Sequence, residues 1–345
     1  MSYIMRNLNM KLLTVTVPCY NSEAYMEKCI ESLLLGGDRV EIIVIDDGSK
    51  DSTGAIGDRY AAQYPNIVRV IHQENGGHGE GINQGLKHAT GKYFKVVDSD
   101  DEVSNQFVAF LDALEACDRA GGVEMFVTNY YYVHTDGVGD RSINYSNVLP
   151  QNRIFGWSEM KRFQMHQMLT IHSCTFRTSL MREWGEPLPK KVFYEDNLMV
   201  CKVLPRVRKI YYFHADLYRY WIGRPDQSVQ EAAMKKRYAQ QVLVSERCFV
   251  ACDLGQVTDK KLKRYLKHEV FMLLGIAICF ARLNKSDEAD ARLDEMWRVC
   301  YAHDKKWARH FRRFSPLALI SVRGKGGKAF TNFIFRLANK VVRFN

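Results

Sequence analysis

The first hundred residues alternate short apolar runs with helical segments, and this pattern limits the fold more than any other feature of the chain. Apolar, β-branched runs at residues 12–17, 40–45, 67–71 and 93–97 are typical of buried strands. The segments between them carry apolar residues at helical spacing. Strands that alternate with helices over short loops form a mainly parallel sheet with helices on its faces. We therefore expect an α/β fold in this part of the chain.

Polar residues follow three of these expected strands. They occupy residues 18–21 after the first strand, 46–49 after the second and 98–100 after the fourth. Ligands of parallel α/β sheets bind beyond the carboxyl ends of the strands. The three segments therefore predict a ligand site along one rim of the sheet.

The fourth strand ends in four acids, Asp98, Asp100, Asp101 and Glu102. Neighbouring carboxylates repel one another unless a cation lies among them, and oxygen ligands suit Mg²⁺ or Mn²⁺. The alternative is a solvated acidic turn that caps the next helix. The two other polar strand ends favour the metal site, because three such clusters on one rim rarely arise by chance.

The net charge of +10 is concentrated near the C-terminal end. Residues 305–345 contain 11 Lys or Arg and no Asp or Glu, which leaves 38 basic against 39 acidic residues before them. Apolar residues at helical spacing among these cations predict an amphipathic tail that binds an anionic membrane surface. Docking of the tail on its own domain and nucleic-acid binding are the alternatives. Nothing before the tail resembles a nucleic-acid-binding fold, so we expect no nucleic-acid partner.

Two observations bound the compartment of the chain. The nine cysteines show no paired metal-ligand spacing, which suggests free thiols in a reducing compartment. The longest apolar run, 270–281, is too short to cross a bilayer. We expect a cytoplasmic protein, peripheral on the inner face of the cell membrane.

The pattern after residue 103 is less regular. It predicts a helix over 157–168, two short strands at 210–213 and 217–221, and a helix that begins at the pair Glu195-Asp196. Three long helical segments follow, at 232–253, 259–283 and 287–301. We therefore expect three regions, namely 1–228 with the sheet, a helical region 229–304, and the basic amphipathic tail 305–345.

Five segments together resemble the family 2 glycosyltransferases: Thr16–Asn21, Ile43–Ser49, Asp51–Thr53, the Gly-Gly-His-Gly turn at 76–79, and Val97–Asp101. The match is dense over 12–103 and thinner to about residue 230. The resemblance implies a GT-A type fold, a mainly parallel sheet flanked by helices, here with a C-terminal helical extension. It also implies a nucleotide-diphosphate-sugar donor, a divalent metal and inversion of the anomeric centre.

The resemblance assigns roles to single residues. Pro18, Tyr20 and Glu23 would line the base pocket, and Asp47, beside Asp46, would accept a hydrogen bond from a pyrimidine ring N–H. The metal ligands would be Asp98 and Asp100, whereas Asp101 and Glu102 would serve the loop and the next helix. The whole donor set is Pro18, Tyr20, Asn21, Glu23, Asp46, Asp47, Gly48, Gly77, His78, Asn83, Asp98, Ser99, Arg224 and Ser228.

The pair Glu195-Asp196 resembles the family's acid pair ahead of a helix. One of the two, Asp196 in our interpretation, would be the general base that deprotonates the acceptor hydroxyl. A helix-capping acid pair is the alternative. Arg224 lies in a segment that resembles the flexible loop over the diphosphate, and a solvated surface arginine is its alternative.

One position departs from the family pattern. Many members carry an arginine near the donor phosphates in the segment after the glycine turn, where this chain has His78. His78 would replace that contact, or another residue would supply it, whereas Asn83 fits the family pattern. Trp157 and His172 are candidates to bind the acceptor, and packing inside the protein is the alternative for Trp157.

We therefore expect a metal-dependent inverting hexosyltransferase that moves a sugar from a UDP-sugar to a saccharide or lipid-linked saccharide in cell-surface polysaccharide synthesis. A nucleotidyltransferase is one alternative, but such enzymes usually carry a glycine-rich basic loop where this chain has residues 18–21. A non-catalytic sugar-nucleotide-binding protein is another. The joint presence of Asp98, Asp100 and Asp196 disfavours it.

Overall fold

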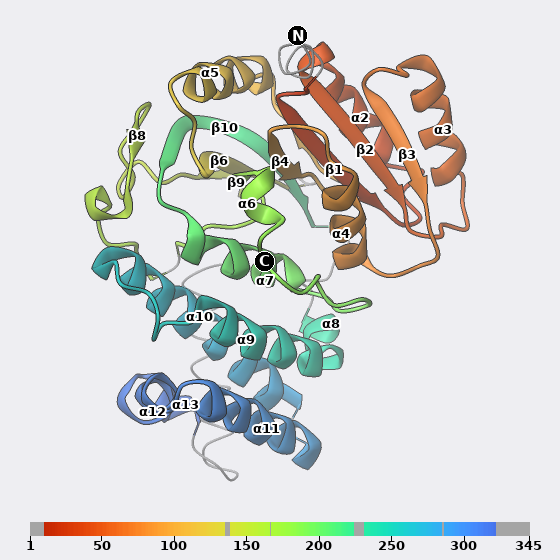
Figure 1. Ribbon diagram of the computed structural model, residues 1–345. Coiled ribbons are helices and arrows are strands. Elements are labelled where there is room, and N and C mark those ends of the chain that lie inside the picture. The colour runs from red at the N-terminus through yellow and green to blue at the C-terminus, as the bar shows by residue number, and fades with distance from the viewer. Residues whose placement is uncertain (1–9, 135–138, 166, 224–230, 285, 322–345) are drawn as a thin grey trace. The chain divides into compact units, whose positions relative to one another are not determined.

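The computed structural model describes residues 10–134, 139–165, 167–223, 231–284 and 286–321. The chain divides into two compact units, and most of their elements are labelled in Figure 1. The first, called the sheet unit below, consists of residues 1–161, 169–192 and 206–222. The second, called the helical unit, consists of residues 162–168, 193–205 and 223–345.

Ten strands form one sheet in the described part of the sheet unit, in the order β3-β2-β1-β4-β9-β6-β10-β5, with β7 beside β6 and β8 beside β10. The strands are β1 (Leu13–Cys19), β2 (Val40–Asp46), β3 (Val68–His72), β4 (Tyr93–Val96), β5 (Glu102–Val103), β6 (Met125–His134), β7 (Arg141–Ile143), β8 (Ile154–Phe155), β9 (Cys174–Arg177) and β10 (Ile210–Ile222). The strands β3, β2, β1 and β4 are mutually parallel, whereas β9 runs antiparallel to both β4 and β6. The expected mainly parallel sheet is confirmed, with antiparallel strands in its second half.

Helices cover the sheet as its side-chain alternation requires. They are α2 (Met26–Leu34), α3 (Thr53–Gln63), α4 (His78–His88), α5 (Phe107–Arg119) and α6 (Thr178–Met181). Val15 of β1 belongs to a buried apolar cluster with Ile30 of α2 and Phe110 of α5. From the other side α4 approaches β1 so closely that a Cβ at Gly85 would lie 2.1 Å from Thr16 Oγ1.

The helical unit contains α7 (Glu195–Val203), α8 (Glu231–Lys236), α9 (Tyr238–Cys252), α10 (Lys260–Asn284), α11 (Asp287–His303), α12 (Lys305–Phe314) and α13 (Leu317–Ile320). Helix α9 packs against α7, α10 and α11. Buried residues such as Val242, Leu266 and Val270 belong to the core of the helical unit. In the part of the chain that the structure describes, no helix combines the length and apolarity needed to cross a membrane.

The elements expected at residues 210–221 and 157–168 differ from the structure. Residues 210–222 form the single strand β10, in which bulges around Asp216 shift the register without ending the strand. The expected helix over 157–168 is wrong, because only the short 3₁₀ turn Trp157–Glu159 is helical there. Trp157, Met160 and Phe163 are each buried, so their helix-like spacing arises from side chains that are buried without an α-helix.

Candidate functional site

The three polar strand ends lie together, as the sequence predicts. The backbone N–H of Asn21, after β1, donates to Ser49 Oγ, after β2, at 3.1 Å. The hydroxyls of Ser22 and Ser99, after β1 and β4, are 2.8 Å apart. These side-chain bonds join loops that are 28 and 77 residues apart in sequence, and they build one polar rim.

The loop after β1 is fixed to the loop after β2 along its length. Asn21 has a left-handed backbone with φ +50°, and its side-chain oxygen accepts from the N–H of Lys50 at 2.8 Å. Glu23 accepts from the N–H of Ser52 at 2.9 Å. Tyr20, directly before Asn21, is 52% exposed, while Pro18 is buried. An exposed ring on a fixed loop is available to a ligand.

The side chain of Asp46, at the end of β2, has two hydrogen-bonding partners. Its carboxylate accepts from the N–H of Ser49 at 3.1 Å and lies 2.9 Å from His72 Nδ1. The other ring nitrogen of His72 lies 3.1 Å from Asp58. Burial acts to raise the pKa of Asp46, but the bonds from Ser49 and His72 outweigh it and hold the pKa below its ordinary value.

Asp47 shapes the glycine turn before α4. One carboxylate oxygen accepts from the N–H of Gly76 at 2.7 Å, and the other accepts from the N–H of Gly77 at 2.8 Å. Gln73 Nε2 also donates to the first oxygen, at 2.6 Å. The following Gly48, with φ +71°, lets the backbone of the turn approach closely. Each carboxylate oxygen has more than one lone pair, so the expected contact of Asp47 with a base stays a prediction.

Helix α4 points its first residue at the end of β4. His78 Nε2 lies 2.9 Å from Asp98 Oδ1, so its imidazole contacts the carboxylate from which the metal site is expected to be built. Asn83, one turn further on, instead holds the chain at Leu188, bonding to both its N–H and its carbonyl at 2.9 and 3.0 Å. The donor roles of both residues stay predictions.

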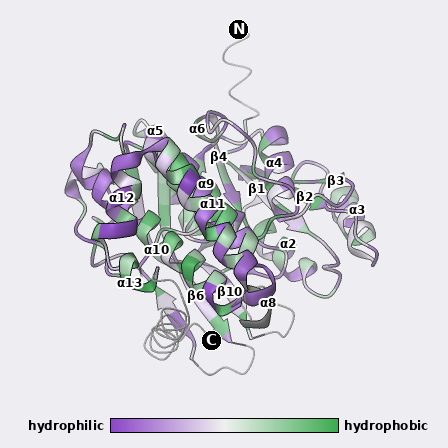
Figure 2. Cartoon of the chain, turned by 90° about the horizontal axis from the view of Figure 1, so that it is seen from below, coloured by the Kyte–Doolittle hydropathy of each residue, from purple (hydrophilic) through white to green (hydrophobic). Residues whose placement is uncertain are grey.

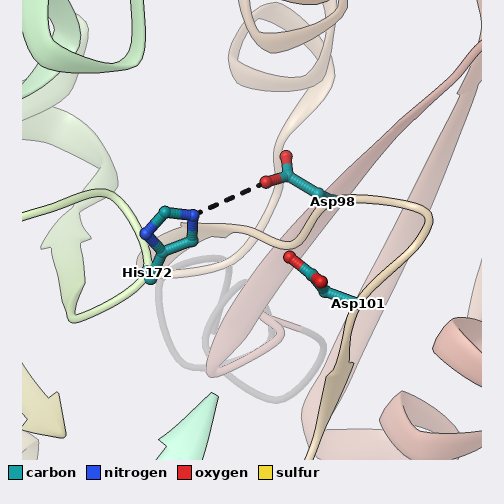
Figure 3. Close-up of side chains that lie close together, drawn as sticks. All are labelled: Asp98, Asp101 and His172. Atoms are coloured by element: carbon teal, nitrogen blue, oxygen red, sulfur yellow. Dashed lines mark ion pairs between the residues drawn. The ribbon is translucent and has the colours of Figure 1, made fainter. Parts of the chain in front are cut away.

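Among the described residues, one group of three or more His, Cys, Asp or Glu side chains could hold a metal ion. It consists of Asp98, Asp101 and His172 (Figure 3). Their ligand atoms all lie within 4.8 Å of one another, and His172 Nε2 is 3.7 Å from Asp98 Oδ2. Two carboxylates and an imidazole are a donor set that Mn²⁺ accepts and that is compatible with Mg²⁺, so the residues fit the expected cation. We call these three residues the Asp98 corner.

This group differs from the expected ligand pair. Asp100 is half-buried and is not one of the three, so its role as a ligand stays a prediction. Sequence reasoning assigned Asp101 and Glu102 to the loop and the next helix. Glu102 does pair with Lys28 and Arg219, each at 3.2 Å, but Asp101 is buried in the Asp98 corner.

Tyr218 of β10 ties the two acids together. Its hydroxyl donates to Asp101 Oδ2 at 2.6 Å and lies 3.3 Å from Asp98 Oδ2. The N–H of Trp221 donates to the other oxygen of Asp101 at 2.8 Å. Burial, and then the charge of Asp98, raise the pKa of Asp101. Burial also acts to raise the pKa of Asp98, but its interactions with His172 and His78 hold that pKa well below its usual value.

His172 is held in place by aromatic packing and by a buried lysine. Its ring stacks on Tyr220 with centroids 4.6 Å apart and meets Tyr218 edge-on at 4.8 Å. Its backbone carbonyl accepts from Lys95 Nζ at 2.8 Å. Burial lowers the pKa of Lys95 to about 8. Sequence reasoning missed Lys95, although a lysine inside an apolar strand was a visible signal.

The remaining expected site residues belong to other segments of the chain. Trp157 is buried, and its indole N–H donates to the carbonyl of Val207 at 2.7 Å, a position that serves packing. Glu195 and Asp196 begin α7 in the helical unit, where Asn197 Nδ2 donates to Asp196 at 3.0 Å. Arg224 and Ser228 lie outside the described residues.

Comparison with protein families identifies the domain that carries this rim. The model of the family described as Glycosyl transferase family 2 matches residues 14–181, which include the three strand ends and the whole Asp98 corner. Residues 14–181 belong to glycosyl transferase family 2. The chain is also 28% identical, over 273 residues, to glycosyltransferase GlyA of Streptococcus pneumoniae. That match covers 73% of this chain and 36% of GlyA, and the chain spans 42% and 27% of the next two curated relatives.

Solved structures of glycosyltransferases share the fold. S. aureus TarS 1-349 in complex with UDP-GlcNAc superposes with a TM-score of 0.63 over 87% of both chains, at 18% identity. The mannosyltransferase PcManGT from Pyrobaculum calidifontis, in complex with GDP-Man and Mn²⁺, gives a TM-score of 0.51 over 90% of this chain and 86% of its own, at 15% identity. At these identities the likeness establishes the GT-A type fold of this chain.

Proposed function

We propose that this chain is a metal-dependent, inverting glycosyltransferase that moves a sugar from a nucleotide-diphosphate donor, with a UDP-sugar as the first choice, to a saccharide or lipid-linked saccharide. One observation carries the proposal. The Asp98 corner lies on the rim that joins the ends of β1, β2 and β4, within the family 2 domain. The printed ligands of the two fold relatives, UDP-GlcNAc for TarS and GDP-Man with Mn²⁺ for PcManGT, support the donor class and the metal.

We assign one set of residues to binding of the nucleotide and another to the cation that faces the diphosphate. The exposed ring of Tyr20 and the carboxylates of Asp46 and Asp47 bind the base and ribose. Asp98, Asp101 and His172 hold the divalent cation, with Asp100 as a further candidate ligand. A bound Mn²⁺ or Mg²⁺ neutralises charge that develops on the departing diphosphate.

The acceptor side rests on α7. Asp196, or its neighbour Glu195, takes the proton of the acceptor hydroxyl as that oxygen attacks the anomeric carbon from the face opposite the diphosphate. Glu195 is 2% exposed and Asp196 is half-buried, which supports Asp196 as the more accessible base. Inversion follows because a single displacement reverses the configuration.

A panel of nucleotide sugars tests this function. The full chain is incubated with UDP-, GDP- and dTDP-sugars and saccharide acceptors, with and without Mn²⁺, and nucleotide release and product anomer are measured. We expect release from one donor class that needs the metal and that is lost in Asp196→Asn, while this variant keeps donor affinity. No release from any donor would overturn the proposal. Donor binding without turnover in the wild type would support a non-catalytic sugar-nucleotide-binding protein.

We propose further that the C-terminal region contacts an anionic membrane surface, which is where a lipid-linked acceptor would lie. Helix α12 is coloured largely hydrophilic in Figure 2, and it exposes Lys305, Lys306, Arg309 and Arg313. Phe314 beside them is 67% exposed. Cations next to an exposed aromatic ring suit a layer of acidic headgroups. The rest of the expected amphipathic tail, 322–345, lies outside the described residues.

Vesicle co-sedimentation tests the membrane contact. Phe311 is buried, so cutting the chain at residue 304 would remove part of the core, and substitution is the better probe. We expect the full chain to sediment with phosphatidylglycerol vesicles and not with phosphatidylcholine vesicles. The variant in which the four cations become glutamine should sediment less. Equal sedimentation of the variant and the wild type would exclude α12 from the contact.

A further inference from the structure

A segment between α6 and α7 lies against the glycine turn and the first turns of α4. We call residues 186–191 the strap. At one end the side chain of Asn83 bonds to both backbone groups of Leu188, at 2.9 and 3.0 Å. At the other end the N–H of Lys191 donates to the carbonyl of Gly76 at 2.7 Å. The strap is therefore fixed at two points, to α4 through Asn83 and to the glycine turn before α4 through Gly76.

The backbone of Lys191 adopts an unusual conformation to reach this position. Its φ of +54° lies in the left-handed region that residues with a side chain rarely adopt. The facing residue is Gly77, with φ +85°, where an added Cβ would lie 2.9 Å from Lys191 N and 3.0 Å from its Cα. Both segments thus adopt a left-handed backbone conformation where Lys191 packs against the glycine turn.

Apolar burial does not explain this arrangement, because the side chain of Lys191 is exposed. Strained backbone that is held by its surroundings is commonly found at functional sites. Here the held backbone touches Gly77, directly before His78, whose Nε2 lies 2.9 Å from Asp98 Oδ1. The backbone of Lys191 therefore packs against the residue directly before His78, which contacts the Asp98 corner.

The two neighbouring lysines of the strap differ in their partners. Lys190 Nζ lies 3.3 Å from Glu80 Oε1, a carboxylate whose side chain is 11% exposed, so the charge of Lys190 is already matched. Lys191 makes no ion pair with any residue that the structure describes. His78, one of the candidates for the phosphate contact, directs Nε2 at Asp98. The phosphates therefore need another cation on this side of the rim.

We propose that Lys191 binds the diphosphate of the donor nucleotide. This inference rests on the proposed function and names a residue for the departing group. An ammonium is a compact charge that contacts phosphate oxygens from many directions, which suits a flexible diphosphate. Its attraction increases as negative charge develops on the leaving group, so Lys191 acts on turnover as well as on nucleotide affinity.

Lys190→Gln is the matched control for Lys191→Gln, because the two positions are adjacent and both side chains are exposed. Binding of UDP and of uridine, which lacks phosphate, is measured by calorimetry at fixed Mn²⁺. We expect Lys191→Gln to weaken UDP binding about tenfold or more and to leave uridine binding within about twofold. Lys190→Gln should bind UDP like the wild type, and Lys191→Arg should keep most of the UDP affinity.

Three results would overturn the assignment of Lys191. They are unchanged UDP affinity in Lys191→Gln, an equal loss in Lys190→Gln, and an equal loss of UDP and uridine, which would mean that the strap is only structural. Each of these leaves the proposed function standing, because the wild type still binds UDP. Absence of UDP, GDP and dTDP binding in the wild type would overturn the proposed function and this inference together.

Discussion

The two halves of the sheet are built from different kinds of interaction. In the half made of β3, β2, β1 and β4, apolar parallel strands end in short polar loops, which are joined by bonds such as that between Ser22 and Ser99. In the half made of β9, β6 and β10, tyrosines pack against His172, and Tyr218 reaches Asp101 from 117 residues away. The first half offers recognition loops, and the second half presents side chains to the acids at the end of β4. The Asp98 corner therefore depends on both.

The largest expected effect is the loss of turnover when the charge of Asp98, where the two halves of the sheet meet, is removed. Asp98→Asn should lower turnover about 10²- to 10³-fold, because it removes a ligand charge and disturbs the ion-pair contacts with His78 and His172. The matched control is Asp58→Asn in α3, an acid of the first half that bonds to His72. Donor turnover at saturating substrate measures both variants. Similar losses of turnover in Asp98→Asn and Asp58→Asn would contradict the special role of the Asp98 corner.

A second test compares close packing in the two halves. Gly85→Ala should destabilise the chain by about 2 kcal/mol, since its Cβ would lie 2.1 Å from Thr16 Oγ1, and overpacking of this kind costs about 1–3 kcal/mol. Gly156→Ala, after β8, meets only Arg208 O at 3.5 Å and should cost much less. Urea unfolding of both variants measures the difference. A Gly85→Ala variant as stable as the wild type would show that α4 can move away from β1.

Tyr218→Phe tests the second half of the sheet. Loss of the hydroxyl leaves Asp101 without its 2.6 Å bond, which we expect to cost about 1–2 kcal/mol of stability. Tyr211→Phe in the same strand is the control, because Tyr211 stacks on Phe126 with centroids 4.7 Å apart. Thermal unfolding and turnover are measured together. If Tyr211→Phe were the more damaging change, stacking and not the hydrogen bond would be the main contribution of β10.

The smallest effect concerns His72, whose pKa is raised, chiefly by its bonds to Asp46 and Asp58. A raised pKa in the folded state means that the stabilisation is fully present below the unfolded value of about 6.5 and is lost as the pH rises through the folded pKa. His72 is half-exposed, so we expect less than about 1 kcal/mol. The stability difference between wild type and His72→Gln should shrink between pH 6 and pH 9. A difference that is constant with pH would contradict this origin.

The sequence was informative where the interactions are local. The strand ends at Asp46 and Asp98 were predicted because an apolar run followed at once by acids is visible within ten residues. Lys95, His172 and Tyr218 were not predicted as one group, because their contacts join positions 46 to 123 residues apart that have no shared pattern. The bulge at Asp216 divided one strand into two apparent runs, and the burial of Trp157, Met160 and Phe163 imitated a helix.

Manganese binding in the presence of UDP tests the central claim most directly. Electron paramagnetic resonance measures free Mn²⁺ as the full chain and UDP are titrated, for the wild type and for Asp98→Asn, with Asp58→Asn as control. The Asp98 corner predicts one Mn²⁺ per chain, bound at least about tenfold more weakly in Asp98→Asn and unchanged in Asp58→Asn. Equal Mn²⁺ affinity in the wild type and Asp98→Asn would contradict it.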